Sequence, residues 1–338
     1  MNKKENTRIS LNHYNNWFSN LSFFKYNTFI LDHINDIWSM INNFLDKIYN
    51  SNLGRVEGRK YTSADLETVK KLSQTFLDNH KINLNIESLE KNNILIFDSY
   101  DKVPSDNYTN GKAEGKVFKD ENNNWKILVY ESKTISDSLI LVHELMHYYN
   151  QPNGERNFVS DMLTESISYA CEMIFLEDML KNDYSEDADY HSILFAAYMF
   201  HLFDNFYPVY KMAYLYKNKN HINKKNYTKL FNDDKYEKML SNFGKYADLH
   251  RSIVRDTWFN LGFPLAMYML ESYKKDSNFI DLILKFNDSI NEKSYEECLS
   301  IIGINNSEEF YSRLDDAFDS FIGYLNNIFK SKEKVLKK

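Results

Sequence analysis

The sequence is poor in the residues that interrupt regular structure or cross-link it. Its 338 residues include 9 glycines, 4 prolines and 2 cysteines, a composition that favours long helices over a turn-rich sheet protein. Cys171 and Cys298 lie far apart in sequence and offer neither a disulfide framework nor the paired thiolates of a structural zinc site. We expect both to be buried or inert thiols, which fits a reducing compartment.

Long hydrophobic runs and an excess of positive charge are also missing. No stretch reaches 18 uncharged apolar residues, and the first residues lack the apolar core and cleavage site of a secretory signal. The formal net charge of −7 argues against a dominant phosphate-binding surface. Hydrophobic residues make up 43% and charged residues 26% of the chain, as in soluble globular proteins. The sequence therefore predicts a cytoplasmic protein that binds neither nucleic acid nor membranes.

Hydrophobic periodicity divides the chain into helical and strand-like regions. Apolar residues recur at helical spacing over residues 10–80, where Thr62 and Asp65 resemble a capping box for the second of two helices. Helical spacing returns after Ser136 and continues to about residue 330. Between them lie three short runs typical of strands, at 94–97, 116–118 and 125–130.

These patterns predict a mainly α fold with a small, mostly antiparallel β-sheet. We expect an N-terminal helical region over residues 1–90 and a larger region over 91–338. The larger region would comprise the sheet, a central pair of helices and a set of C-terminal helices, at 91–131, 136–182 and 187–330.

One short motif carries metal-binding chemistry. In SDSLILVHELMHYY, the four-residue spacing places His143 and His147 on one face of a helix that Ser136 or Asp137 can cap. Two neutral imidazoles can then share one Zn²⁺, and Glu144 can reach a water at the open coordination position. The alternative interpretation is a pair of structural histidines on an amphipathic helix. The motif predicts zinc-dependent hydrolysis with Glu144 as the general base.

A catalytic zinc ion needs a third protein ligand. The next predicted helix, FVSDMLTESISYACEMIF, has an acidic face opposite an apolar one. Glu165 is the first candidate, because the loop after the motif can fold this helix back onto the preceding one. The alternatives are Glu172, Asp161 and Glu155, and carboxylates that do not bind the metal could accept hydrogen bonds from the imidazole N–H groups.

The motifs resemble those of the thimet oligopeptidase family, and within it the oligoendopeptidase F branch. That family follows its His-Glu-x-x-His helix with Glu-x-x-Ser-x-x-x-Glu, which Glu165, Ser168 and Glu172 match. The segment NGKAEGKVF at 110–118 is similar to the family's Gly-Lys-x-x-Gly segment. Two later segments, 261–270 and 295–318, resemble its last helices. The resemblance covers about residues 105–330 in the family's order.

The resemblance implies a zincin-like helical metallopeptidase fold in a shortened form, with the small sheet beside the active-site helix. It also implies one Zn²⁺ per chain and short or unfolded peptides as substrates. The chain departs from the family in having Met146 where Gly is common and a much shorter N-terminal part. In the family, a His and one or more Tyr near a late glycine stabilise the oxyanion. His250 and Tyr268, on either side of Gly262, are the counterparts that this chain offers.

We therefore predict a zinc-dependent metalloendopeptidase whose zinc ion is bound by His143, His147 and Glu165. The strand-like run 125–130 is expected to bind an extended peptide through a free backbone edge. Two alternatives remain open at this level. One is a peptidase-like protein that binds peptides or regulates a partner with little turnover, and the other is a dedicated protease of a single partner protein.

Overall fold

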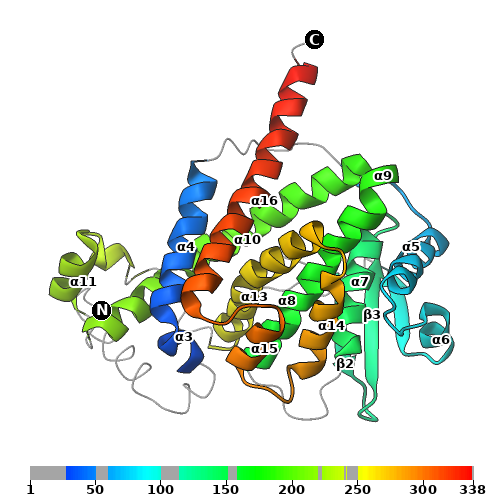
Figure 1. Cartoon of the computed structure of the whole chain (residues 1–338), viewed down its shortest axis with the longest axis horizontal. Helices are drawn as coiled ribbons and strands as arrows, with labels where there is room; N and C mark the ends of the chain where they lie inside the picture. Colours follow the sequence, from blue (N-terminus) through cyan, green and yellow to red (C-terminus); the bar gives the residue numbers. More distant parts are fainter. Residues whose placement is uncertain are drawn as a thin grey trace, which may run out of the picture.

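The computed structural model is mainly α-helical with one small sheet (Figure 1), as the sequence predicts. It describes residues 28–50, 60–99, 114–150, 158–219, 223–239, 241 and 250–336. The elements in chain order are α3 (Thr28–Asp32), α4 (Ile34–Tyr49), α5 (Leu66–Asn79), α6 (Ile86–Lys91), β1 (Leu95–Ser99), β2 (Gly115–Lys119), β3 (Trp125–Glu131), α7 (Ser136–Tyr149), α8 (Phe158–Phe175), a π-helical turn (Leu176–Leu180), α9 (Lys181–Asp183), α10 (Ser185–Lys219), α11 (Lys224–Phe231), α13 (His250–Lys275), α14 (Phe279–Ser289), α15 (Tyr295–Ile301) and α16 (Ser307–Leu336). Residues 10–27, the first part of the predicted N-terminal helices, lie outside the described residues.

The three predicted strands form one sheet of order β1-β3-β2, and the sheet is mixed. β2 and β3 are antiparallel, joined by a turn in which the Asp120 carboxylate accepts hydrogen bonds from the backbone N–H groups of Asn122 and Asn124, both at 2.9 Å. β1 pairs with the other side of β3 in parallel. The small sheet is as predicted, but one of its two strand pairs is parallel where a mostly antiparallel sheet was expected. The expected free edge on residues 125–130 is wrong, because β3 is the central strand with a neighbour on each side.

Helix α5 begins later in the chain than an N-cap at Thr62 would require. Asp65 is the N-cap residue of α5, and its carboxylate accepts a 2.8 Å hydrogen bond from the backbone N–H of Thr68. Thr62 is used elsewhere, since its N–H and its hydroxyl group both donate to the Asp187 carboxylate at 2.7 Å. The segment before α5 is thereby fixed to the start of α10.

Aromatic side chains dominate the core on the far side of the molecule from the sheet. Phe44 of α4 is fully buried and lies 5.0 Å from the ring of Phe203 on α10 and 4.9 Å from that of Phe318 on α16. Phe263 of α13 meets the same cluster at 5.4 Å from Phe44. These centroid separations are those of favourable edge-to-face and offset aromatic pairs. These aromatic contacts join α4, α10, α13 and α16.

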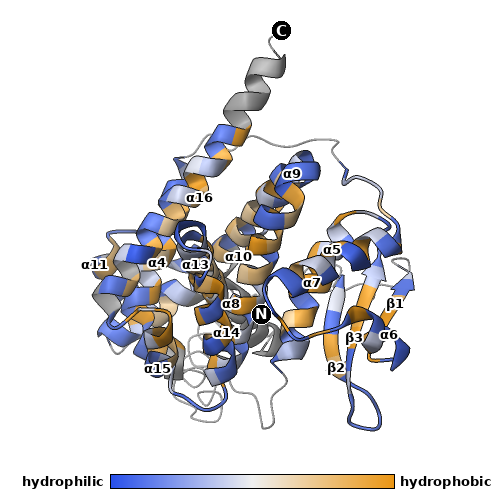
Figure 2. Cartoon of the chain, turned by 45° about the vertical axis from the view of Figure 1, so that its right-hand side comes forward, coloured by the Kyte–Doolittle hydropathy of each residue, from blue (hydrophilic) through white to orange (hydrophobic). Residues whose placement is uncertain are grey.

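The helices α7, α8 and α13 lie between the sheet with α5 and α6 on one side and the α4, α10 and α16 group on the other (Figure 1). Figure 2 shows β3 as largely hydrophobic, and its residues Ile127 and Val129 are fully buried where β3 packs against α7. α13 packs along α8, where Gly262 permits close approach: a Cβ atom there would lie 3.0 Å from the Met162 carbonyl oxygen. None of the helices in the described ranges combines the length and hydrophobicity needed to cross a membrane.

Candidate metal centre

Helix α7 presents two histidines to one point in space. His143 and His147 are four residues apart and therefore lie on the same helix face. Their Nε2 atoms are 3.1 Å apart. The helix is held rigidly, because Leu141, Val142 and Leu145 on its other faces are fully buried. Its start differs from the predicted cap: α7 has no side-chain cap bond, and the Asp137 carboxylate accepts from the backbone of the preceding loop.

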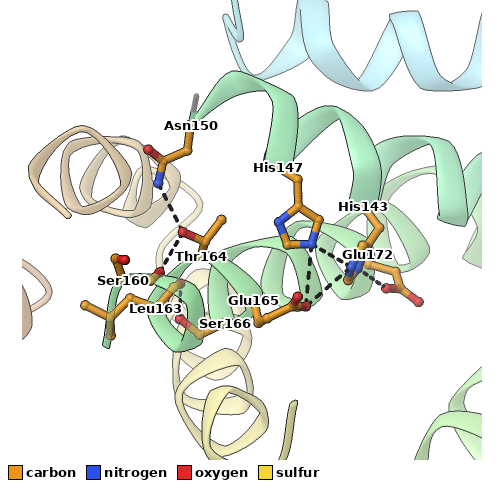
Figure 3. Close-up of polar contacts among 9 residues, drawn as sticks. All are labelled: His143, His147, Asn150, Ser160, Leu163, Thr164, Glu165, Ser166 and Glu172. Carbon is orange, nitrogen blue, oxygen red and sulfur yellow. Dashed lines mark hydrogen bonds and ion pairs between the residues drawn. The ribbon is translucent and has the colours of Figure 1, made fainter. Parts of the chain in front are cut away.

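Helix α8 adds a carboxylate to the two imidazoles. Glu165 Oε2 lies 3.6 Å from His143 Nε2 and 3.5 Å from His147 Nε2. Figure 3 shows the three side chains pointing towards one another across the interface of α7 and α8. They form the one group of three metal-binding side chains that the described part of the chain brings together. The structure therefore brings together the three residues that the sequence analysis predicted as ligands.

The spacing of the three atoms fits a small tetrahedral ion. With bonds of about 2.0 to 2.1 Å, tetrahedral angles place the ligand atoms of zinc about 3.3 to 3.4 Å apart. The observed separations of 3.1, 3.5 and 3.6 Å bracket that value. Glu165 Oε2 is also buried without a hydrogen-bond partner among the described residues. A buried oxygen that faces two imidazole nitrogens and has no hydrogen-bond partner fits the role of a metal ligand.

Glu172, one of the alternative ligands, has a different position. Its Oε2 atom lies 2.9 Å from Nδ1 of His143, on the side of the ring opposite Nε2, which faces Glu165. This contact fixes the imidazole with its proton on Nδ1 and its lone pair on Nε2, as ligand histidines require. Asp161 is buried on α8 but is not part of the cluster. Glu155 lies outside the described residues.

The carboxyl groups of Glu165 and Glu172 are both held in the charged form. Burial raises the pKa of Glu165, but the neighbouring His147 and His143 outweigh it and lower the pKa to about 2. Burial is likewise outweighed at Glu172 by hydrogen bonds from His143 and His191, which lower its pKa to about 2. Glu165 is thus a carboxylate suited to a divalent cation, and Glu172 is a carboxylate suited to accepting N–H groups.

Glu144 differs from these two carboxylates in its environment. It is buried beside the cluster, and burial raises its pKa against the opposing effect of His147 and His143. Its side chain lies against Gly115 at the start of β2, where an added Cβ would be 2.7 Å from Glu144 Cγ and 2.9 Å from Oε1. A carboxyl group with a raised pKa in a fixed position is suited to taking up and returning a proton.

Of the two predicted oxyanion groups, the structure describes the side chain of Tyr268, and its hydroxyl group bonds to residues outside the cluster. The Tyr268 hydroxyl group donates to the Ile302 carbonyl at 2.7 Å and accepts from Arg313 at 2.9 Å. Tyr268 is six residues beyond Gly262, about 240° around α13, so it points away from the face that meets α8. We therefore assign Tyr268 a structural role. His250 is the first residue of α13, and its side chain lies outside the part that the structure describes.

Two residues close to the site escaped the sequence reasoning. His191 Nε2 lies 2.8 Å from Glu172 Oε1, and the Tyr61 hydroxyl group lies 2.9 Å from His191 Nδ1. Tyr169, one turn after Glu165 on α8, packs its ring edge-to-face on His143 with centroids 5.1 Å apart. Tyr61 and His191 come from segments far from the motif, and no local spacing links them to it.

Comparison with known proteins finds likeness in structure and not in sequence. The sequence matches no protein-family model, and no curated protein matches it. Among solved structures, PZ peptidase A in complex with an inhibitor matches with a TM-score of 0.52 and 13% identity over 86% of this chain. A protein assigned as an oligoendopeptidase F from Bacillus anthracis str. Ames matches with a TM-score of 0.51, 12% identity and 86% coverage. One assigned as a peptidase from Chlamydophila abortus matches with a TM-score of 0.50, 14% identity and 89% coverage.

The matched region is a larger share of this chain than of each neighbouring structure. This chain spans 58%, 57% and 55% of the length of those three structures, in the same order. At 12 to 14% identity the likeness concerns the course of the backbone. The chain has a peptidase-like fold, with its candidate metal ligands on two adjacent helices of that fold.

Proposed function

We propose that this chain is a zinc-dependent metallopeptidase of the thimet oligopeptidase and oligoendopeptidase F type. The observation that carries the proposal is the triangle formed by Nε2 of His143, Nε2 of His147 and Oε2 of Glu165. Its edges suit one tetrahedral zinc ion, and a fourth position for water or substrate would remain open. The peptidase-like fold supports peptides as the substrate class.

The roles of the residues follow from their chemistry. A bound Zn²⁺ supplies a Lewis acid that polarises the scissile carbonyl group and acidifies water. Glu144 accepts the proton of the attacking water and returns a proton to the leaving amine nitrogen, for which its raised pKa is suited. Glu172 keeps the His143 ring in the orientation in which Nε2 faces Glu165. The metal ligands therefore stay in place while Glu144 moves the proton.

β2 is the strand that would orient the substrate. It is an edge of the sheet, and within the described residues no strand pairs with its outer side. Its first residue, Gly115, contacts Glu144, so a peptide that adds to this edge would pass beside the general base. Backbone hydrogen bonds of this kind bind extended peptides with little dependence on sequence. We infer that short or unfolded peptides are the substrates.

The proposal is tested by cleavage of a mixed peptide library with the zinc-loaded protein and its Glu144→Gln variant. Glu121→Gln, an exposed position in the turn between β2 and β3, serves as the matched control. We expect cleavage by the wild type and the control, and a loss of more than about 100-fold in the Glu144 variant with zinc retained. Undiminished cleavage by Glu144→Gln would refute the mechanism. Absence of cleavage by the zinc-loaded wild type would favour a peptide-binding role.

A further inference from the structure

The Glu172 carboxylate is shared between two histidines from different helices. Its Oε2 atom is 2.9 Å from Nδ1 of His143 on α7, and its Oε1 atom is 2.8 Å from Nε2 of His191 on α10. All three side chains are at most 15% exposed. Each carboxylate oxygen therefore has one N–H donor, and a charge that burial alone would disfavour is stabilised from both sides.

The second histidine is itself held by a tyrosine. The Tyr61 hydroxyl group lies 2.9 Å from His191 Nδ1. Tyr61 is anchored by its neighbour, because Thr62 donates two 2.7 Å hydrogen bonds to the carboxylate of Asp187 on α10. Burial raises the pKa of Tyr61 far above its usual value, so the phenol keeps its proton and acts as the donor.

Only one arrangement of protons satisfies these contacts with a neutral His191. Tyr61 O–H donates to Nδ1 of His191, and Nε2–H of His191 donates to Glu172 Oε1. Glu172 Oε2 then accepts from Nδ1–H of His143, which leaves the Nε2 lone pair of His143 facing Glu165. Every donor and acceptor in the series is used once, and the series ends at the candidate metal ligand.

We propose that His191, held in place by Tyr61, is a positioning residue of the metal centre. By donating to one oxygen of Glu172 it fixes the plane of that carboxylate, and it draws off part of the negative charge that would otherwise act on His143. The inference rests on the proposed function, because it concerns how tightly the centre binds zinc. Without His191, Glu172 Oε1 would be buried without this donor, and the carboxylate could rotate away from His143.

The size of the effect follows from its distance to the ion. Loss of a direct hydrogen-bond partner of a metal ligand typically weakens metal binding or activity by 10- to 100-fold. His191 acts one hydrogen bond further out, so we expect its loss to weaken zinc binding by about 10-fold, at the lower end of that range. Tyr61 acts through His191, and we expect roughly a threefold effect from Tyr61→Phe.

The experiment separates the hydrogen bond from packing, since the His191 ring also stacks on Phe195. In the full chain, His191→Leu removes the donor but keeps an apolar body, whereas in His191→Gln the side-chain amide can still donate to Glu172. His201→Leu, at an exposed position on the same helix, is the matched control. The readouts are the zinc dissociation constant by chelator competition, the visible spectrum of the Co²⁺-substituted protein and the melting temperature without metal.

We expect about 10-fold weaker zinc binding and a changed Co²⁺ spectrum in His191→Leu, with values in His191→Gln and His201→Leu close to those of the wild type. Wild-type zinc affinity in His191→Leu would overturn the inference while leaving the proposed function intact. Equal losses in His191→Leu and His191→Gln, matched by equal losses of metal-free melting temperature, would reduce His191 to a packing residue. If the wild-type protein binds no zinc, the proposed function itself fails.

Discussion

Replacing Gly115 with alanine should disable the general base without touching a metal ligand. A Cβ atom at this position would lie 2.7 Å from Glu144 Cγ, 2.9 Å from Glu144 Oε1 and 2.9 Å from Ile140 Cγ2. Favourable contacts between carbon atoms lie at about 3.5 to 4.0 Å. The Glu144 side chain must therefore shift by about 1 Å or adopt another rotamer. Gly115 has no positive φ angle, so the substitution adds no backbone strain.

A displacement of this size has a predictable cost. Misplacing a catalytic group by 1 Å can reduce the rate by about 100-fold. We therefore expect kcat of Gly115→Ala to fall by about 100-fold, with a loss of about 1 to 3 kcal/mol in the free energy of unfolding from overpacking. Zinc content should stay at the wild-type level, because the substitution meets Glu144 and Ile140 and none of the three ligands.

The assay compares steady-state peptide hydrolysis, zinc content and urea unfolding for Gly115→Ala and Gly323→Ala. Gly323 on α16 is the matched control, since an added Cβ there would have no atom within 4 Å. We expect the control to keep its activity. Wild-type kcat in a folded, zinc-loaded Gly115→Ala protein would refute the reasoning, because the observed position of Glu144 would then not be the one from which it acts.

Four further predictions concern stability. Gly262→Ala should lower the free energy of unfolding by about 1 to 3 kcal/mol in urea titrations, since its Cβ would lie 3.0 Å from a backbone oxygen of α8 that cannot yield easily. Lys211→Met should cost about 1 to 3 kcal/mol by the same assay, because it removes the 3.1 Å ion pair of the buried Lys211 with Asp233; wild-type stability would contradict this. The backbone N–H of Lys235 lowers the pKa of Asp233 from 3.8 to about 2. The contribution of the Asp233 carboxylate to the free energy of unfolding is therefore complete above about pH 4 and disappears as the pH falls towards 2, as urea unfolding measured across that range would reveal. Zinc at 100 times its dissociation constant should stabilise the wild type by about 2.7 kcal/mol and Glu165→Ala much less, as melting curves with and without chelator would show.

The sequence contained the local part of the site. The spacing of His143 and His147 sufficed to place them on one helix face, because that depends only on the helical repeat. The acidic face of the next helix offered Glu165 as the first candidate, with Glu172, Asp161 and Glu155 as alternatives. The three predicted strand runs likewise follow from short-range patterns, and the structure has β1, β2 and β3 there.

What the sequence could not predict depends on contacts between distant segments. The hydrogen bond of Tyr61 with His191 joins residues 130 positions apart, and no periodicity links the two. The central position of β3 could not be predicted for a related reason. The neighbours of a strand depend on tertiary pairing, and the sequence pattern of a single strand does not distinguish an edge strand from a central one. The hydroxyl partners of Tyr268, Ile302 and Arg313, could not be predicted either, because they come from a turn and a helix much later in the chain.

The most direct test of the metal centre is the zinc stoichiometry of the purified wild-type protein and of its Glu165→Ala variant, measured by mass spectrometry of the metal after dialysis against a weak chelator. The triangle of His143, His147 and Glu165 predicts one zinc per wild-type chain and a clear loss in the variant. One zinc retained by Glu165→Ala, or none held by the wild type, would contradict the assignment.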